Sequence, residues 1–341
     1  MKDASNSSSV ERKLQIWSLC RSAQSSLAQG HYRRAEVLYH SALKTGEAAL
    51  NAEPLEHSVI LNNLAVVYKY TGDFDRAERL YRRALEITEK TLGPDHAEVA
   101  TIYHNLGGLE HARGRYAEGE PLARRSVAIR ERAHGPDHVD VAADLAALAA
   151  ILDGQRKYNE SEPLYRRALA IFERAHGPEH YEIAINLNNL AALKYAQARP
   201  AEAEQLYRRA LVMKETLLGP DHPDVAMTLN NLAVLLKAQG SYEEAERMYT
   251  RALSIFGREL GADHPKVKNC RENYIRLRRQ IAREHSEAKG GGRLQREVRE
   301  ADMTPGTCGV ITLNALTGST LPADFNMNPA RPSPAAHIAA A

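Results

Sequence analysis

The sequence has few cysteines, little net charge and no long hydrophobic run. Its 341 residues include only Cys20, Cys270 and Cys308, which are odd in number, widely spaced and form no C-x-x-C pair. This usage argues against a disulfide framework or a zinc site and fits a reduced, cytoplasmic setting. The formal net charge of +2 provides no global field that would favour nucleic acid or an anionic membrane as a partner.

Further absences narrow the class of protein. No apolar run approaches the roughly 20 residues that a membrane-spanning helix needs, and the N-terminal MKDASNSSSVERK has no apolar segment of the kind found in secretory signals. No P-loop, dinucleotide fingerprint, H-E-x-x-H or G-x-S-x-G motif occurs. We therefore expect no enzymatic activity, cofactor, metal, small-molecule substrate or membrane association.

What the sequence does contain is a repeat of 42 residues. The word LNNLA at 229–233 recurs at 187–191 and 61–65. When the units are aligned on the first residue of this word, that residue falls every 42 positions, at Leu19, Leu61, Tyr103, Leu145, Leu187, Leu229 and Arg271. A period of this length indicates a repeat array, which grows linearly and never builds one large core.

Each period predicts two helices, because apolar residues recur at spacings of three and four on two successive stretches. A turn position separates the stretches, and it holds Gly30, Gly72, Gly114, Arg156, Ala198 and Gly240. On the second stretch, glutamate precedes arginine by four residues in the pairs Glu78–Arg82, Glu120–Arg124, Glu162–Arg166 and Glu204–Arg208. Such pairs suit a solvated helix face.

A loop of the type Gly-Pro-Asp-His closes most units. We expect Asp95, Asp137 and Asp221 to cap the helices that follow, since aspartate is a preferred N-cap residue. The loop histidines invite a metal interpretation, but one histidine per unit leaves them too far apart for zinc ligands. We expect a role at the helix start for these histidines, which are His96, His138, His180, His222 and His264.

The sequence therefore predicts an all-α solenoid of six helical hairpins plus a C-terminal capping helix. The hairpins lie near 10–50, 54–92, 95–134, 137–176, 179–218 and 221–260, followed by the capping helix at 263–288. Residues 1–8 are polar and serine-rich, and 289–341 are a low-complexity tail; we expect both to be disordered. The capping helix carries Arg276, Arg278, Arg279 and Arg283, which we interpret as a solvated basic face diluted by glutamates.

The pattern resembles the tetratricopeptide repeat (TPR). The Leu…Leu-Ala…Tyr spacing of the first helix, the G-x-[YF]-x-x-A turn and the later Ala-Leu match that framework over about residues 10–288. The 42-residue length and the words LNNLA, YRRAL and GPDH are similar to the kinesin-light-chain type. The resemblance implies a right-handed superhelix whose first helices line a concave groove for an extended peptide. The heptad coiled coil of kinesin light chains is not seen here, so motor association does not carry over.

If the first helices line a groove, the face of each one that does not pack in the core points into that groove. Asn62, Asn188 and Asn230 are expected to face the groove, because an amide can both donate to and accept from a peptide backbone. For the neighbouring Asn63, Asn105, Asn189 and Asn231, two roles remain open, either in the groove or in bonding to the next helix of the stack. The same face also carries Lys69, His104, His111, Tyr195 and Lys237.

The predicted function is that of a protein–protein interaction scaffold or adaptor that holds a partner segment in the groove. One alternative is a regulatory protein whose own tail, with Val310, Ile311, Leu313 and Leu316, folds back into the groove. Another is an RNA-binding helical array that uses the basic cap. The near-neutral net charge disfavours nucleic acid.

Overall fold

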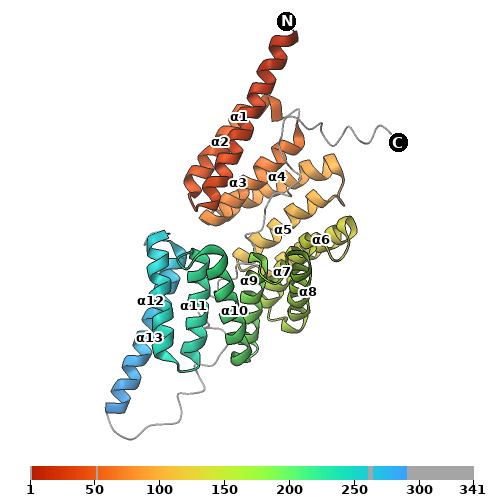
Figure 1. Cartoon of the computed structure of the whole chain (residues 1–341). Helices are drawn as coiled ribbons and strands as arrows, with labels where there is room; N and C mark the ends of the chain where they lie inside the picture. The colour runs from red at the N-terminus through yellow and green to blue at the C-terminus, as the bar shows by residue number, and fades with distance from the viewer. Residues whose placement is uncertain (1, 51–52, 260–263, 290–341) are drawn as a thin grey trace. The chain divides into compact units, whose positions relative to one another are not determined.

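The computed structural model describes residues 2–50, 53–259 and 264–289, and every regular element in these ranges is an α-helix. Thirteen helices follow one another along this part of the chain (Figure 1). They are α1 (Lys2–Ala28), α2 (Tyr32–Leu50), α3 (Pro54–Thr71), α4 (Phe74–Leu92), α5 (Ala97–Ala112), α6 (Tyr116–His134), α7 (Val139–Gly154), α8 (Tyr158–His176), α9 (Tyr181–Ala196), α10 (Pro200–Leu218), α11 (Pro223–Ala238), α12 (Tyr242–Glu259) and α13 (Pro265–Lys289). The predicted all-helical fold is confirmed.

The helices pack as hairpins. Each odd-numbered helix from α1 to α11 packs against the even-numbered helix that follows it, and α13 packs against α12. The chain divides between Pro136 and Asp137 into two compact units. In unit 1, α1–α6, successive hairpins meet through α2 with α3 and α4 with α5; in unit 2, α7–α13, they meet through α8 with α9 and α10 with α11. Within each unit, the hairpins therefore cover one another as the repeat predicts.

A buried tyrosine marks the second helix of five of the six hairpins. These residues, Tyr39, Tyr81, Tyr165, Tyr207 and Tyr249, expose at most 1% of their surface. An alanine three residues after each one is also fully buried, which lets the two helices of a hairpin approach closely. In the third hairpin the tyrosine position is Ala123. There Gly107 of α5 lies so close that a Cβ on it would stand 3.4–3.5 Å from atoms of Ala123.

The turn inside each hairpin requires a left-handed residue. Gly72 has φ +83°, and its N–H and that of the next residue bond back to carbonyls of the last turn of α3. At the equivalent positions, Arg156 (φ 60°) and Ala198 (φ 57°) adopt the same conformation without being glycine. A side chain with a Cβ is strained there, so the backbone geometry is set by the hairpin rather than by the residue.

Histidine, not aspartate, caps the five first helices α5, α7, α9, α11 and α13. His96 Nδ1 accepts a hydrogen bond from the N–H of Glu98 at 3.2 Å, and the four equivalent histidines make the same bond to the residue two positions on. The expected role of these histidines at the helix start is confirmed, whereas the expected aspartate caps are wrong. The imidazole lies one residue nearer the helix, where it reaches the second free N–H.

The loop aspartates bind arginines of the following hairpin instead. Asp95 Oδ1 accepts from Arg125 at 2.9 Å, and Arg132 lies 3.1 Å from the same oxygen. Equivalent pairs join Asp137 to Arg174 at 2.6 Å and Asp221 to Arg258 at 2.7 Å. These contacts hold the loop against the second helix of the hairpin that the loop precedes. The four predicted Glu–Arg pairs on the second helices are confirmed at 2.8–2.9 Å.

Boundaries at the two ends of the array differ from the expected ones. Helix α1 begins at Lys2, so residues 2–8 are helical where the sequence analysis expected disorder. No glycine or proline occurs between Lys2 and Ala28, so nothing in this stretch interrupts a helix. The tail expected at 289–341 lies outside the described residues from position 290 onward. No helix in the described ranges combines the length and the apolar character that crossing a bilayer requires.

The left-handed conformation of Ala198, in the turn between α9 and α10, predicts that glycine is favoured at this position. We predict that Ala198→Gly stabilises the protein by about 0.5–1 kcal/mol, because it relieves roughly 1–2 kcal/mol of left-handed strain and loses part of this to chain entropy. Urea unfolding followed by circular dichroism measures the shift. The matched control, Ala170→Gly on the exposed side of α8, should instead destabilise by about 1 kcal/mol. A lower midpoint for Ala198→Gly would contradict the assignment.

The histidine caps predict a loss of stability in mild acid. The cap needs an unprotonated Nδ1, and burial, followed by a neighbouring charge, lowers the pKa of His96, His180 and His264 below 6.5. Because the folded pKa values are lowered, the caps stabilise the fold above pH about 6.5, and this stability is lost as the pH falls through the folded pKa values.

Thermal melts between pH about 7.5 and 5 should therefore show a falling Tm. The double variant His96→Asn/His264→Asn should show a weaker pH dependence, because asparagine caps helices without titrating. His285→Asn on the exposed end of α13 is the control and should keep the wild-type dependence. Equal slopes for the cap variant and wild type would rule out the caps as the cause.

Candidate peptide-binding surface

The predicted groove residues lie at matching positions on successive first helices. Unit 1 carries Asn62, Asn63 and Lys69 on α3 and His104, Asn105 and His111 on α5; unit 2 carries Asn188, Asn189 and Tyr195 on α9 and Asn230, Asn231 and Lys237 on α11. All seven asparagine side chains in this set are buried, and each exposes at most 7% of its surface. His111, Tyr195 and Lys237 are half-buried. The amides are thus more enclosed than a groove lining alone would require.

In unit 1, Asn62, Asn63 and Asn105 form a chain of hydrogen bonds that joins two neighbouring repeats. We call the series of such positions along the first helices the asparagine ladder, and a position where the amides bond directly a closed step. Asn105 Nδ2 donates to Asn62 Oδ1 at 2.9 Å, and Asn62 Nδ2 donates to Asn63 Oδ1 at 3.3 Å. The second asparagine of one repeat therefore reaches back to the first asparagine of the repeat before it. Asn105 thus has the stacking role that the sequence left open.

Unit 2 contains a second closed step at its C-terminal end. Asn273 Nδ2 of α13 donates to Asn230 Oδ1 at 3.2 Å, and Asn230 Nδ2 donates to Asn231 Oδ1 at 3.3 Å. Sequence reasoning missed Asn273. The 42-residue period places it directly after Asn231, so counting one more period would have found it. Asn62 and Asn230, which we expected to face the groove, both have their carbonyl oxygens bonded to the next repeat.

The step between α9 and α11 is open. Asn188 Oδ1 and Asn231 Nδ2 occupy the positions that bond in the two closed steps, yet neither atom has a hydrogen-bond partner among the described residues. Both polar atoms of Asn189 also lack a partner there. These side chains expose at most 2% of their surface. Leaving such buried groups unpaired costs about 1–3 kcal/mol each, which marks this step as different from the others.

Seven residues after the position of Asn62, the residue type varies from repeat to repeat. The equivalent residues are Lys69, His111, Asp153, Tyr195 and Lys237. Burial lowers the pKa of Lys69 to about 8, and burial together with the charge of Lys69 lowers the pKa of His111 to about 4. The His111 ring meets Tyr116 edge-on, with centroids 5.4 Å apart. Burial raises the pKa of Asp153, the equivalent residue of α7, to about 7. Each unit therefore presents its own chemistry at this position.

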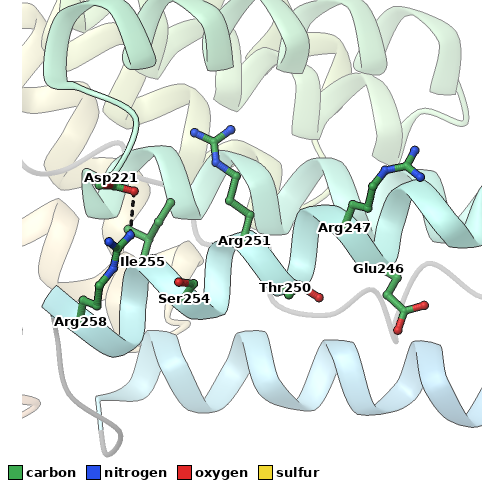
Figure 2. Close-up of a pocket in the computed structure, with 8 residues that line it drawn as sticks. All are labelled: Asp221, Glu246, Arg247, Thr250, Arg251, Ser254, Ile255 and Arg258. Atoms are coloured by element: carbon green, nitrogen blue, oxygen red, sulfur yellow. Dashed lines mark hydrogen bonds and ion pairs between the residues drawn. The ribbon is translucent and has the colours of Figure 1, made fainter.

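A shallow hollow of about 450 Å³ lies elsewhere in unit 2, along α12. Figure 2 shows Arg247 and Arg251 extending to the same side of this helix, while Arg258 reaches Asp221. Arg251 also lies 2.5 Å from Glu215 and donates to the carbonyl of Pro220. Two of the three arginines thus hold the preceding loop and helix. None of the predicted groove residues lines this hollow. No group of three or more histidine, cysteine, aspartate or glutamate residues in the described ranges is placed to hold a metal ion.

Solved structures of three proteins are similar to this chain. BtubC (BKLC) from P. vanneervenii is 26% identical, with a TM-score of 0.50 over 72% of this chain and 91% of that one. A Rap protein complexed with competence and sporulation factor is 14% identical, with a TM-score of 0.54 over 79% of this chain and 76% of that one. A candidate kinesin light chain of Podosopora anserina is 23% identical, with a TM-score of 0.49 over 60% of this chain and 96% of that one.

Comparison with curated proteins found no match. Two family models of the tetratricopeptide repeat do match, one over residues 56–118, 98–174 and 148–216 and the other over residues 225–266. Together these matches cover more than half of the sequence, and they agree with the hairpins and the 42-residue period described above. Proteins built in this way generally serve as protein-interaction scaffolds. The chain belongs to the tetratricopeptide repeat family.

Proposed function

We propose that the protein is a non-catalytic scaffold that binds an extended peptide segment along its first helices, and that the open asparagine step of unit 2 receives the peptide backbone. The observation that supports this most directly is the set of unpaired amide groups on Asn188, Asn189 and Asn231. These atoms are buried in the free protein, so a peptide reaches them only when the step between α9 and α11 widens. Its backbone then offers both N–H donors and C=O acceptors, which are the groups that these amides lack.

The spacing of the helices suits such a ligand. Adjacent packed helices lie roughly 8–10 Å apart, and an extended chain rises about 3.3 Å per residue. About three peptide residues therefore span the step from α9 to α11. Main-chain bonding at this step would make binding tolerant of the sequence of the ligand, and the half-buried Tyr195 and Lys237 would contact its side chains.

The closed steps supply the rigid frame for this site. Asn230 bonds to Asn273 on one side and to Asn231 on the other, so the open end of the ladder is held in place before any ligand arrives. The similarity to a Rap protein complexed with competence and sporulation factor is consistent with this proposal at the level of the fold.

Removing an unpaired amide should affect stability differently from removing a paired one. We predict that Asn189→Leu leaves the Tm of the free protein unchanged or raises it, because no hydrogen bond is lost. Asn105→Leu at the same repeat position should destabilise by about 1–3 kcal/mol, because it leaves Asn62 Oδ1 buried and unpaired. Thermal and urea unfolding measure both variants. Equal losses of stability for the two variants would show that Asn189 is satisfied within the fold.

Peptide selection tests the binding proposal itself. A phage-displayed random peptide library is selected on the immobilised protein, and the affinities of the recovered peptides are measured by fluorescence anisotropy. The double variant Asn188→Ala/Asn231→Ala should bind about 5- to 150-fold more weakly, since each of the two lost main-chain hydrogen bonds contributes about 0.5–1.5 kcal/mol. Asn105→Ala is the control in unit 1. Recovery of no peptide, or undiminished binding by the double variant, would reject the proposal.

A further inference from the structure

Helix α13 ends the described part of unit 2 and presents one side to the array. It packs against α12 and α11 and buries Val267, Cys270 and Leu277. Asn273 joins the asparagine ladder from the same side. The apolar side of this helix is therefore fully used in packing, and its opposite side is exposed.

The exposed side of α13 is basic. Arg271, Arg276, Arg279 and Arg283 are all exposed and follow one another at spacings of three to five residues, which places them on one broad helix face. Ile275, 40% exposed, lies among them. We call these five residues the α13 arginine face.

Arg279 and Arg283 of the α13 arginine face lack the preceding glutamate that neutralises arginines on the second helices. There, a glutamate four residues before the arginine pairs with it, as Glu162 does with Arg166 at 2.8 Å. On α13 the residue four positions before Arg283 is Arg279, and the residue four positions before Arg279 is Ile275. Like charges at this spacing repel one another by a few tenths of a kcal/mol.

The two described glutamate side chains of α13 offset little of this charge. Glu284 accepts hydrogen bonds from Tyr242 of α12 and from Gln280, so it is turned toward the array. Glu272 lies 3.6 Å from Arg276 and is, within the described residues, the one acid that contacts the face. Arg279 and Arg283 therefore remain two adjacent cations without an ion pair among the described residues.

We propose that the α13 arginine face is a docking surface for an acidic segment of a protein partner, separate from the asparagine step. Guanidinium groups bind carboxylates through paired hydrogen bonds, and docking an acidic segment would relieve the repulsion between Arg279 and Arg283. From Arg276 to Arg283 the helix rises about 10 Å, which matches about three residues of an extended acidic peptide. Ile275 would contact the aliphatic part of the same segment.

Two other polyanions fit the face less well. A lipid surface is disfavoured because Ile275 is the one large hydrophobic side chain of α13 that is markedly exposed in the described ranges, which leaves no apolar face to insert. Nucleic-acid binding depends on many phosphate contacts, and a face about 10 Å long reaches few of them. The formal net charge of +2 adds no wider basic field.

The test uses the full chain and a fluorescein-labelled oligo-glutamate peptide, with fluorescence anisotropy at low ionic strength. We expect Arg279→Gln/Arg283→Gln to weaken binding about tenfold, or about 1.4 kcal/mol. Arg166→Gln, which removes an exposed but ion-paired arginine of α8, should change the affinity by less than about twofold. Circular dichroism confirms that all variants keep their helical content.

Two further measurements decide the identity and the place of the ligand. Asn231→Ala should bind the oligo-glutamate peptide like wild type, because the α13 arginine face does not depend on the asparagine step; loss of binding in this variant would overturn the placement. An oligouridylate of matched length should compete weakly. If it competes better than the peptide, or if the Arg279/Arg283 variant binds the peptide as wild type does, the proposal is wrong.

Discussion

The structure depends on the close packing of two helices around one large and several small buried side chains, repeated every 42 residues. A tyrosine such as Tyr81 or Tyr207 fills the space inside the hairpin, and alanines on both helices allow the approach that buries it. A hairpin alone would leave its second apolar face in water. Each added hairpin covers that face and offers a new one, so stability accumulates by nearest-neighbour contacts.

Because the apolar core fixes the spacing of the first helices, polar side chains can be placed between repeats with regular geometry. The asparagine ladder uses this regularity. Its steps Asn62–Asn105 and Asn230–Asn273 are closed by direct amide hydrogen bonds, whereas the step from Asn188 to Asn231 is not. The same sequence position thus stabilises the stack in one place and presents unused hydrogen-bonding capacity in another. The proposed peptide site follows from that difference.

The sequence predicted the helices, the hairpins and the outward ion pairs, because these depend on local spacing. It did not predict which loop residue caps each helix. Asp95 and His96 are adjacent and both carry acceptors, so the choice depends on the exact backbone path into α5. Nor could it decide between the groove and the stack for Asn105 and Asn231. That choice depends on how far neighbouring first helices are rotated about their axes, which spacing alone does not specify.

The central claim is that the amides of the open step meet the backbone of a bound peptide. Nuclear magnetic resonance of the side-chain amides of asparagine, labelled with nitrogen-15, tests it most directly. On addition of a peptide recovered by selection, the side-chain signals of Asn188, Asn189 and Asn231 should shift while that of Asn105 stays in place. Shifts confined to Asn105, or an absence of shifts at all of these asparagines under saturating peptide, would contradict the account.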